Sequence, residues 1–253
     1  MAARKKAMTK RSATRRRVYV ASQTPLYSAK FYKGDYIDRQ RQANTDKCVA
    51  YVEHHFNSSS AQAASYSVVI TGANASQISQ NWGRWYARAV AQEFDVPLGG
   101  DQGIMVGGYG GRGDFNLRFT DMPAILLEPL FASNPQHAGI IKSEDGQAKL
   151  AEILCASIQR FFQKGGLIAF SVGHKYKTSA PNDRGAAVIG GGSEADYAEA
   201  VLLKAKDLLE AITQPEEQRE IQVQMGNRIV WKQAIDADAD VSWDPARGIL
   251  RLD

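Results

Sequence analysis

The sequence predicts an α/β fold in which a mainly parallel, twisted sheet is flanked by helices. Short apolar runs alternate along the chain with longer stretches whose apolar residues recur at helical spacing, which is the pattern of repeated strand–helix units. The 253 residues suffice for one substantial domain with a full core. No run of eighteen apolar residues occurs, so we expect no membrane-spanning helix. No apolar segment follows the first charges, so we expect no secretory signal peptide.

The predicted elements follow one another in this alternating order. The predicted strands are Val18–Ser22, Cys48–Phe56, Ala124–Glu128 and Leu167–Val172. The predicted helices are Asp38–Asp46, Ser76–Phe94, a segment marked by Leu150 to Phe161, and a segment with the apolar stripe Tyr197, Val201, Ala205, Leu208 and Ile212. Ser193 is a suitable N-cap for the last of these helices. The glycine-rich stretch Gly99–Gly113 is predicted to be a loop.

The chain changes character near Pro215. Three short β-like runs, Ile221–Gln224, Arg228–Gln233 and Ile249–Leu252, are separated by turn signals. Residues 214–253 therefore form a small predicted β-rich appendage, too short to hold a core alone. We expect it to pack on the main domain, residues 18–213, or on another chain.

The positive charge is concentrated in residues 1–17, which carry eight cations and no acid. The rest of the chain has 31 − 8 = 23 cations and 27 acids, a net charge of −4. Two interpretations of this basic tail remain open. It is either a disordered, solvated segment or a contact for nucleic acid, anionic lipid or an acidic wall polymer.

Cysteines and tryptophans indicate structural roles. Cys48 and Cys155 lie in apolar, periodic segments and are expected to be buried free thiols. Trp82 and Trp85 are expected to belong to the core of their helix, with a sugar-binding role as the alternative.

Four side chains stand where chemistry concentrates in parallel α/β sheets, just beyond the carboxyl ends of strands. His55 and His174 follow two predicted strands, Glu128 ends a third, and Glu194 begins a helix. Two imidazoles and a carboxylate are a sufficient ligand set for a catalytic zinc ion with one open position. A second carboxylate could then take a proton from water.

The other candidates have simpler interpretations. His54 precedes His55 and points to the other face of its strand, because side chains alternate along a strand. His137 lies on a polar segment and is expected at the surface. The Gly107–Gly113 run lacks the Lys-Ser/Thr ending of a phosphate-binding loop, so we expect a flexible loop near the cleft.

Three segments resemble the family of zinc-dependent N-acetylmuramoyl-L-alanine amidases. MPAILLEPLFASN and the helix after it (Met122–Phe162) are similar to the end of that domain, and GGDQGI (Gly99–Ile104) resembles its glycine-isoleucine loop. DRQRQAN followed by VEHHFNS, within Asp38–Ser58, resembles its arginine-containing helix and its strand with a His-x-Asn ligand motif. On this resemblance His55 is a zinc ligand.

The opening part of the family pattern is found near the end of the chain. In Phe170–Ala211, His174 matches a Gly-His ligand, Gly185–Ala186 a Gly-Ala pair, and Glu194 a ligand at a helix start. The next family strand matches the predicted strand near residues 17–22. The resemblance therefore implies a circularly permuted amidase domain that retains every ligand.

The resemblance also implies the reaction. His55, His174 and Glu194 would hold Zn²⁺, and Glu128 would be the general base that cleaves the amide between N-acetylmuramic acid and L-alanine of peptidoglycan. Two alternatives stay open: an inactive virion or cell-wall-binding protein on the same fold, and a zinc peptidase acting on other wall bonds. A wall substrate without a signal peptide suggests a bacteriophage endolysin, in the host cytoplasm before lysis, or a virion-associated enzyme whose appendage contacts virion proteins.

Overall fold

The computed structural model describes residues 25–213, together with the backbone of strands at 219–225, 228–235, 241–244 and 249–252. The basic tail and the predicted strand at Val18–Ser22 lie outside this range. The chain divides into two compact units, and Pro25–Gln214 forms the larger one.

The larger unit is built on a six-stranded sheet, which confirms the predicted α/β class. Five strand pairs form it, and all are parallel except β3 with β7. In spatial order the strands are β1 (Tyr27–Phe31), β8 (Gly166–Val172), β2 (Ala50–His54), β7 (Ala124–Glu128), β3 (Val68–Thr71) and β4 (Ile104–Val106). Neither β1, where polar residues interrupt the apolar ones, nor the four-residue β3 was predicted from the sequence.

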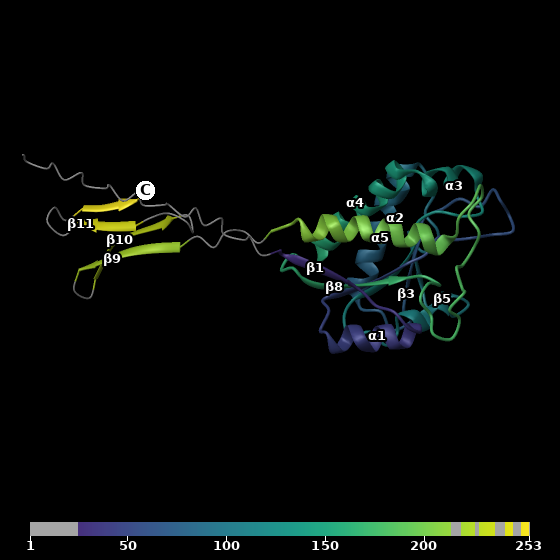
Figure 1. Cartoon of the computed structure of the whole chain (residues 1–253), viewed down its shortest axis with the longest axis horizontal. Coiled ribbons are helices and arrows are strands. Elements are labelled where there is room, and N and C mark those ends of the chain that lie inside the picture. Colours follow the sequence, from purple (N-terminus) through teal and green to yellow (C-terminus); the bar gives the residue numbers. More distant parts are fainter. Residues whose placement is uncertain (1–24, 214–218, 226–227, 236–240, 245–248, 253) are drawn as a thin grey trace, which may run out of the picture. The chain divides into compact units, whose positions relative to one another are not determined.

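Helices cover both faces of the sheet (Figure 1). Three long helices form one layer: α2 (Gln77–Phe94), α4 (Glu144–Phe161) and α5 (Glu194–Glu210). The short helix α3 (Pro135–Lys142), which was not predicted, packs against α4. On the other face lies α1 (Tyr36–Thr45), in contact with the 3-10 turn η1 (Asp114–Asn116).

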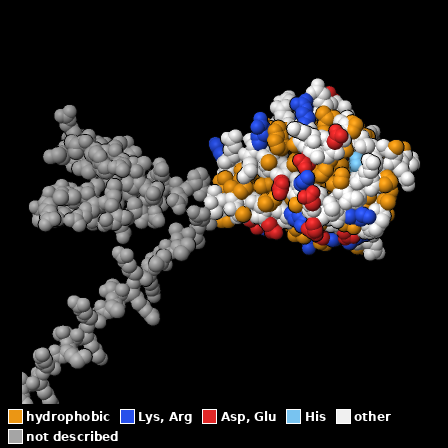
Figure 2. Space-filling view, turned by 90° about the horizontal axis from the view of Figure 1, so that it is seen from above, with side chains coloured by type: hydrophobic (Ala, Val, Ile, Leu, Met, Phe, Trp, Pro, Cys, Tyr) orange, Lys and Arg blue, Asp and Glu red, His pale blue; other side chains and the backbone are white. Residues whose placement is uncertain are grey.

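The buried stripe of α5 matches the prediction only in part, because Tyr197 and Ile212 are half-buried and Ile212 lies beyond the end of the helix. Val201 and Ala205 are fully buried, but Leu208 is 39% exposed and Leu209 takes its place in the core. Ser193 is the N-cap residue, yet its hydroxyl donates to Asp196 and makes no capping bond to the backbone. Figure 2 looks onto this layer of helices, where acidic and basic side chains are interspersed with apolar ones.

Alternation along the strands decides which side chains face α1. Tyr51 packs with Ala43 of α1, whereas Val52 packs in the core beneath the three long helices. Glu53 and His55 therefore lie on the α1 face, and His54 on the opposite one. Leu126 belongs to the α1-side core, so Glu128, two residues later, shares the face of His55.

The predicted loop Gly99–Gly113 contains regular structure, so that prediction was wrong in part. It holds β4 and a small hairpin of β5 (Gly108–Tyr109) and β6 (Arg112–Gly113). Gly110 and Gly111 form its turn, both with positive φ. Gly108, within β5, also has a positive φ, and a Cβ there would collide with Arg112 O, so glycines occur in the strands as well as in the turn and composition alone suggested a loop.

Two connections bring distant parts of the chain together. Residues 162–165 join α4 to β8, which lies in the sheet between β1 and β2. The end of α5 meets the start of β1: Leu26 N–H donates to Ile212 O at 2.7 Å, and Pro25 forms a β-bridge with Thr213.

The second unit contains two antiparallel pairs. β9 (Arg219–Met225) pairs with β10 (Arg228–Ile235), and β11 (Val241–Asp244) with β12 (Ile249–Leu252). The three predicted runs lie within β9, β10 and β12, and β11 was missed. Within the described part of the chain, none of the helices has the length and apolarity needed to cross a bilayer. Cys48 and Cys155 are buried and free, as predicted.

Candidate active site

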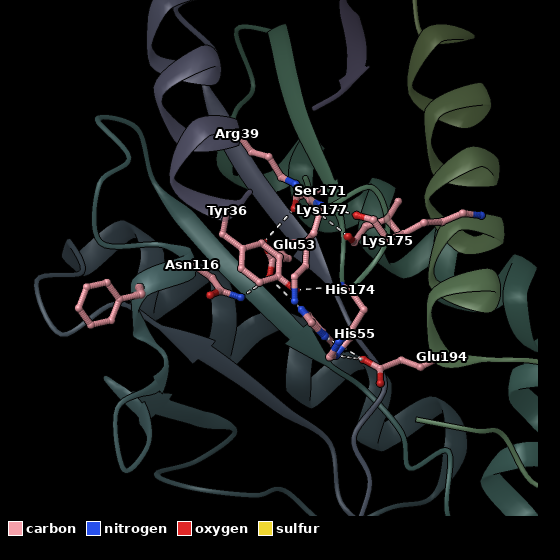
Figure 3. A network of polar contacts seen from close by, with 12 residues as sticks. Tyr36, Arg39, Glu53, His55, Asn116, Ser171, His174, Lys175, Lys177 and Glu194 are labelled. Carbon is pink, nitrogen blue, oxygen red and sulfur yellow. Dashed lines mark hydrogen bonds and ion pairs between the residues drawn. The ribbon is translucent and has the colours of Figure 1, made fainter. Parts of the chain in front are cut away.

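Three side chains from separate elements converge at the carboxyl edge of the sheet. His55 follows β2, His174 follows β8, and Glu194 is the first residue of α5 (Figure 3). One donor atom from each lies within 4.8 Å of the other two. Glu194 Oε1 is 2.8 Å from His55 Nδ1 and 3.4 Å from His174 Nε2. These are the three residues that the sequence analysis predicted as metal ligands.

Close approach of the backbone lets the three groups meet. Strands β2 and β8 are adjacent, with His54 opposite Val172, so His55 and His174 leave the sheet side by side. A Cβ on Gly173 would lie 2.4 Å from His55 Cε1, and one on Gly185 would lie 2.4 Å from Glu194 Oε2. Glycine at both positions is therefore required for His55 and Glu194 to approach one another.

In each histidine, the ring nitrogen that faces away from Glu194 lies within hydrogen-bond distance of a second carboxylate. His55 Nε2 lies 2.8 Å from Glu53 Oε1, and His174 Nδ1 lies 3.0 Å from both oxygens of Asp183. Metal-binding histidines usually present one nitrogen to the ion while the other donates to such a partner. Neither carboxylate was predicted from the sequence. For Glu53 the available signal was its position two residues before His55 on the same strand face.

The charges around Glu194 favour a cation. Burial lowers the pKa of His55, but hydrogen bonds to Glu194 and Glu53 overcome this and raise it well above the usual value. Burial raises the pKa of Glu194, yet hydrogen bonds from His174 and His55 bring it below the usual range. Two imidazoles and an anionic carboxylate match the donors of a catalytic zinc site, so the residues present fit a metal ion.

Glu128 ends β7 on the same face and lines the same cleft. Its Oε2 atom is buried without a hydrogen-bond partner among the described residues. Burial raises the pKa of Glu128 to about 8, although the nearby His55 lowers it. A carboxyl group in this environment holds its proton more tightly than a free one, which suits an acid–base role.

The cleft has a volume of about 730 Å³ and is lined by both polar and apolar groups. Lys177 pairs with Asp183 at 2.7 Å. Arg112 on β6 also lines the cleft, and no described carboxylate lies within ion-pair distance of it. Besides the four predicted site residues, the lining includes Tyr36, Asn57, Tyr66, Tyr109 and Asn116.

The remaining candidates are structural. His54 is fully buried on the far face of the sheet, its ring 4.9 Å from that of Phe56, and burial lowers its pKa to about 3. The prediction that His137 lies at the surface was wrong. Its position on α3 buries it, and its ring bonds to Phe131 N–H and the Ser65 hydroxyl, each at 3.0 Å. Trp82 is a core residue, as predicted, and donates to Ser157.

The family follows from comparison of the sequence with known families. The model of the N-acetylmuramoyl-L-alanine amidase family, Amidase_3, matches residues 5–160, which is more than half of the chain. The chain belongs to this family. The matched segment contains His55 and Glu128 and ends before His174 and Glu194. No curated protein matches the chain.

Solved amidase structures show partial similarity. The catalytic domain of CwlV, an N-acetylmuramoyl-L-alanine amidase from Bacillus (Paenibacillus) polymyxa var. colistinus, is 25% identical with a TM-score of 0.43, over 51% of this chain and 66% of that one. The corresponding amidase from Clostridium difficile 630 is 24% identical with a TM-score of 0.44, over the same shares. AmiC2 of Nostoc punctiforme is 20% identical with a TM-score of 0.41, over 50% of this chain and 64% of that one. This chain thus spans slightly less than two thirds of their lengths.

Proposed function

We propose that this protein is a zinc-dependent peptidoglycan hydrolase that cleaves the amide bond between N-acetylmuramic acid and the L-alanine of the stem peptide. The observation that carries the proposal is the convergence of His55, His174 and Glu194 with Glu128 in one cleft, in a chain of the amidase family. Polar groups in the cleft lining, among them Asn57, Asn116 and Arg112, suit a substrate made of sugar hydroxyls, amides and carboxylates.

His55, His174 and Glu194 would hold the metal ion. A zinc ion there supplies Lewis acidity, which polarises the scissile carbonyl and makes water a better nucleophile. Glu128 takes a proton from the attacking water and returns it to the nitrogen of the leaving L-alanine. The products are the free lactyl carboxylate of the muramoyl group and a peptide with a new L-alanine amino terminus.

Product analysis tests this proposal against its alternatives. Purified peptidoglycan is digested with the zinc-loaded protein, and the new amino termini are identified. We expect L-alanine termini. New D-amino acid ends would instead identify a peptidase, and zinc binding without any product would identify a wall-binding protein.

We also propose that the domain is circularly permuted. The family match ends before β8 begins. Nevertheless β8 lies inside the sheet, between β1 and β2, and it is followed by the site residue His174. The contact of Ile212 with Leu26 provides a place where an unpermuted chain would pass from α5 directly into β1.

The cellular role that we propose is that of a phage enzyme, either an endolysin or a virion-associated wall hydrolase. The basic segment 1–17, with eight cations and no acid, supports a further contact with an anionic polymer. Detection of the protein in purified particles, and not only in lysates, would identify the virion-associated form.

A further inference from the structure

We propose that Glu53 is a positioning residue that holds His55 with Nδ1 turned toward the other two proposed metal ligands, His174 and Glu194. We further propose that Arg39, acting through Ser171, holds Glu53 in place. The inference rests on the metal-binding role proposed above. It concerns a network that links helix α1, strand β2 and strand β8 behind the cluster (Figure 3).

Glu53 accepts hydrogen bonds on both carboxylate oxygens. Its side chain is fully buried, with Oε1 facing His55 Nε2 and the amide of Asn116, and Oε2 accepting from the Ser171 hydroxyl at 2.9 Å. An acceptor at His55 Nε2 requires that nitrogen to carry the ring hydrogen. In the metal-free fold Nδ1 donates to Glu194 Oε1 at 2.8 Å, and with a metal ion bound its lone pair would be free to ligate the ion.

Arg39 is a buried cation that is surrounded by neutral acceptors. Its guanidinium donates to Ser171 Oγ at 2.8 Å and to the carbonyls of Gly34, Val172 and Lys175. No described carboxylate lies within ion-pair distance of it. A buried charge without a counter-charge is costly, and Glu53 lies one hydroxyl group away. Ser171 accepts from Arg39 with its oxygen, and its own hydrogen is therefore free to bond Glu53.

The same guanidinium also secures the second histidine. The carbonyls of Val172 and Lys175 flank the turn that carries His174, whose φ is +62°. His174 N–H additionally donates to the hydroxyl of Tyr36, on the same helix as Arg39. Arg39 thus fixes the turn of His174 directly and the ring of His55 through two intermediates.

The network reaches the substrate cleft at Asn116. This residue lines the cleft and, from η1, shares Glu53 Oε1 with His55. A stabilising role alone would make Glu53 important for folding and irrelevant to the affinity for metal. A positioning role makes it affect metal affinity even where the fold is intact.

Zinc affinity of Glu53 variants tests the proposal. Full-length wild type, Glu53→Gln and Glu53→Ala are titrated with Zn²⁺ against a chromophoric chelator, and the visible spectra of the Co²⁺-loaded forms are compared. We expect Glu53→Ala to bind Zn²⁺ about 10- to 100-fold more weakly, with an altered Co²⁺ spectrum. Glu53→Gln keeps the size and one acceptor oxygen, so its loss should be smaller.

Ser171→Ala and Ser157→Ala form a matched pair of controls. Each removes a buried hydroxyl that accepts an N–H, from Arg39 at 2.8 Å and from Trp82 at 2.9 Å respectively. Both should lower the melting temperature. Only Ser171→Ala should weaken zinc binding, by several-fold, because Ser157 lies on α4, where it contacts Trp82 of α2 and no residue of the site. Equal zinc affinities for these two variants would overturn the link through Ser171.

The outcomes separate this inference from the proposed function. If wild type binds no zinc, the metal site itself is wrong. If wild type binds zinc and the folded Glu53 variants match its affinity and Co²⁺ spectrum, the positioning role is wrong and the amidase proposal stands. Should Glu53→Ala fail to fold, Glu53→Gln and Ser171→Ala decide the matter by the same measurements.

Discussion

At the scale of single residues, the two kinds of carboxylate in the cleft should respond differently to mutation. Glu128→Ala is expected to retain zinc and to lose wall hydrolysis by on the order of a hundredfold or more, because it removes the proposed general base and none of the proposed ligands. His174→Ala and Glu194→Ala should lose both metal and activity. Metal analysis of the purified variants, combined with a wall-digestion assay, checks this. Full activity of Glu128→Ala would show that another group takes the proton.

The raised pKa of Glu128 makes a prediction about stability. In the metal-free fold this carboxyl titrates at about 8, against an ordinary value of 4.5. Between these pH values the folded state binds more protons than the unfolded state, so the contribution of Glu128 is present below about pH 4.5 and is lost as the pH rises through 8. Glu128→Gln should remove this loss, which is on the order of a few kcal/mol.

Thermal unfolding in the presence of a chelator measures this difference. The melting temperature of wild type should fall relative to that of Glu128→Gln as the pH rises from 5 to 8.5. Parallel curves for the two proteins would mean that Glu128 is solvated and ionises normally.

At the scale of elements, the turn after β8 depends on a residue without a side chain. Gly173→Ala would place a Cβ 2.4 Å from the ring of His55, so we expect the ring to shift and zinc binding to weaken at least tenfold. Gly139→Ala on α3 is the control, because its Cβ would meet no atom within 4 Å. Zinc titration of both variants tests this, and wild-type affinity in Gly173→Ala would show that the ring can move without cost.

The β5–β6 hairpin makes a prediction about substrate binding. Arg112 brings an exposed guanidinium to the cleft, where a carboxylate of the stem peptide could pair with it. Arg112→Gln should therefore raise KM about 3- to 30-fold and leave kcat nearly unchanged. Arg88→Gln, an exposed arginine of α2 that donates to Gln102, should change neither constant. Steady-state kinetics on soluble muropeptides would contradict the prediction if kcat fell instead.

At the scale of the whole molecule, the order of the connections should not matter to the site. A variant of residues 25–213 in which Thr213 is joined to Pro25 by a short linker, with new ends between Phe162 and Gln163, should fold and bind zinc like the unrotated fragment. The expectation rests on the contact between Leu26 and Ile212 and on the placement of all ligands by the sheet. Circular dichroism and zinc titration compare the two fragments.

A second rotation provides the control for this experiment. New ends between Phe170 and Ser171 would cut β8, which pairs with β1 and β2 along its length. That variant should not fold. If both rotations behaved alike, the sheet would not be what positions the ligands.

The sequence predicted for a physical reason that His55, His174 and Glu194 lie together. His55 and Glu128 end apolar runs long enough to be recognised as buried strands, and parallel strands carry their carboxyl ends to one edge of a sheet. The position of Glu194 was predicted from the start of a helix that follows a run of glycines. The same reasoning failed for β1, where polar residues interrupt the apolar ones, and for β3 and α3. The missed α3 is why His137 was expected at the surface.

What the sequence determined, then, is which residues stand at the ends of strands and on which face each side chain points, because both follow from local patterns of two or three residues. Tertiary structure alone decided which residues from distant parts of the chain contact them. Glu53 bonds Ser171 from 118 positions away, Arg39 reaches the turn of His174, and Ile212 meets Leu26. Contacts between residues so far apart in the sequence depend on how strands are ordered in the sheet, and no local pattern contains that order.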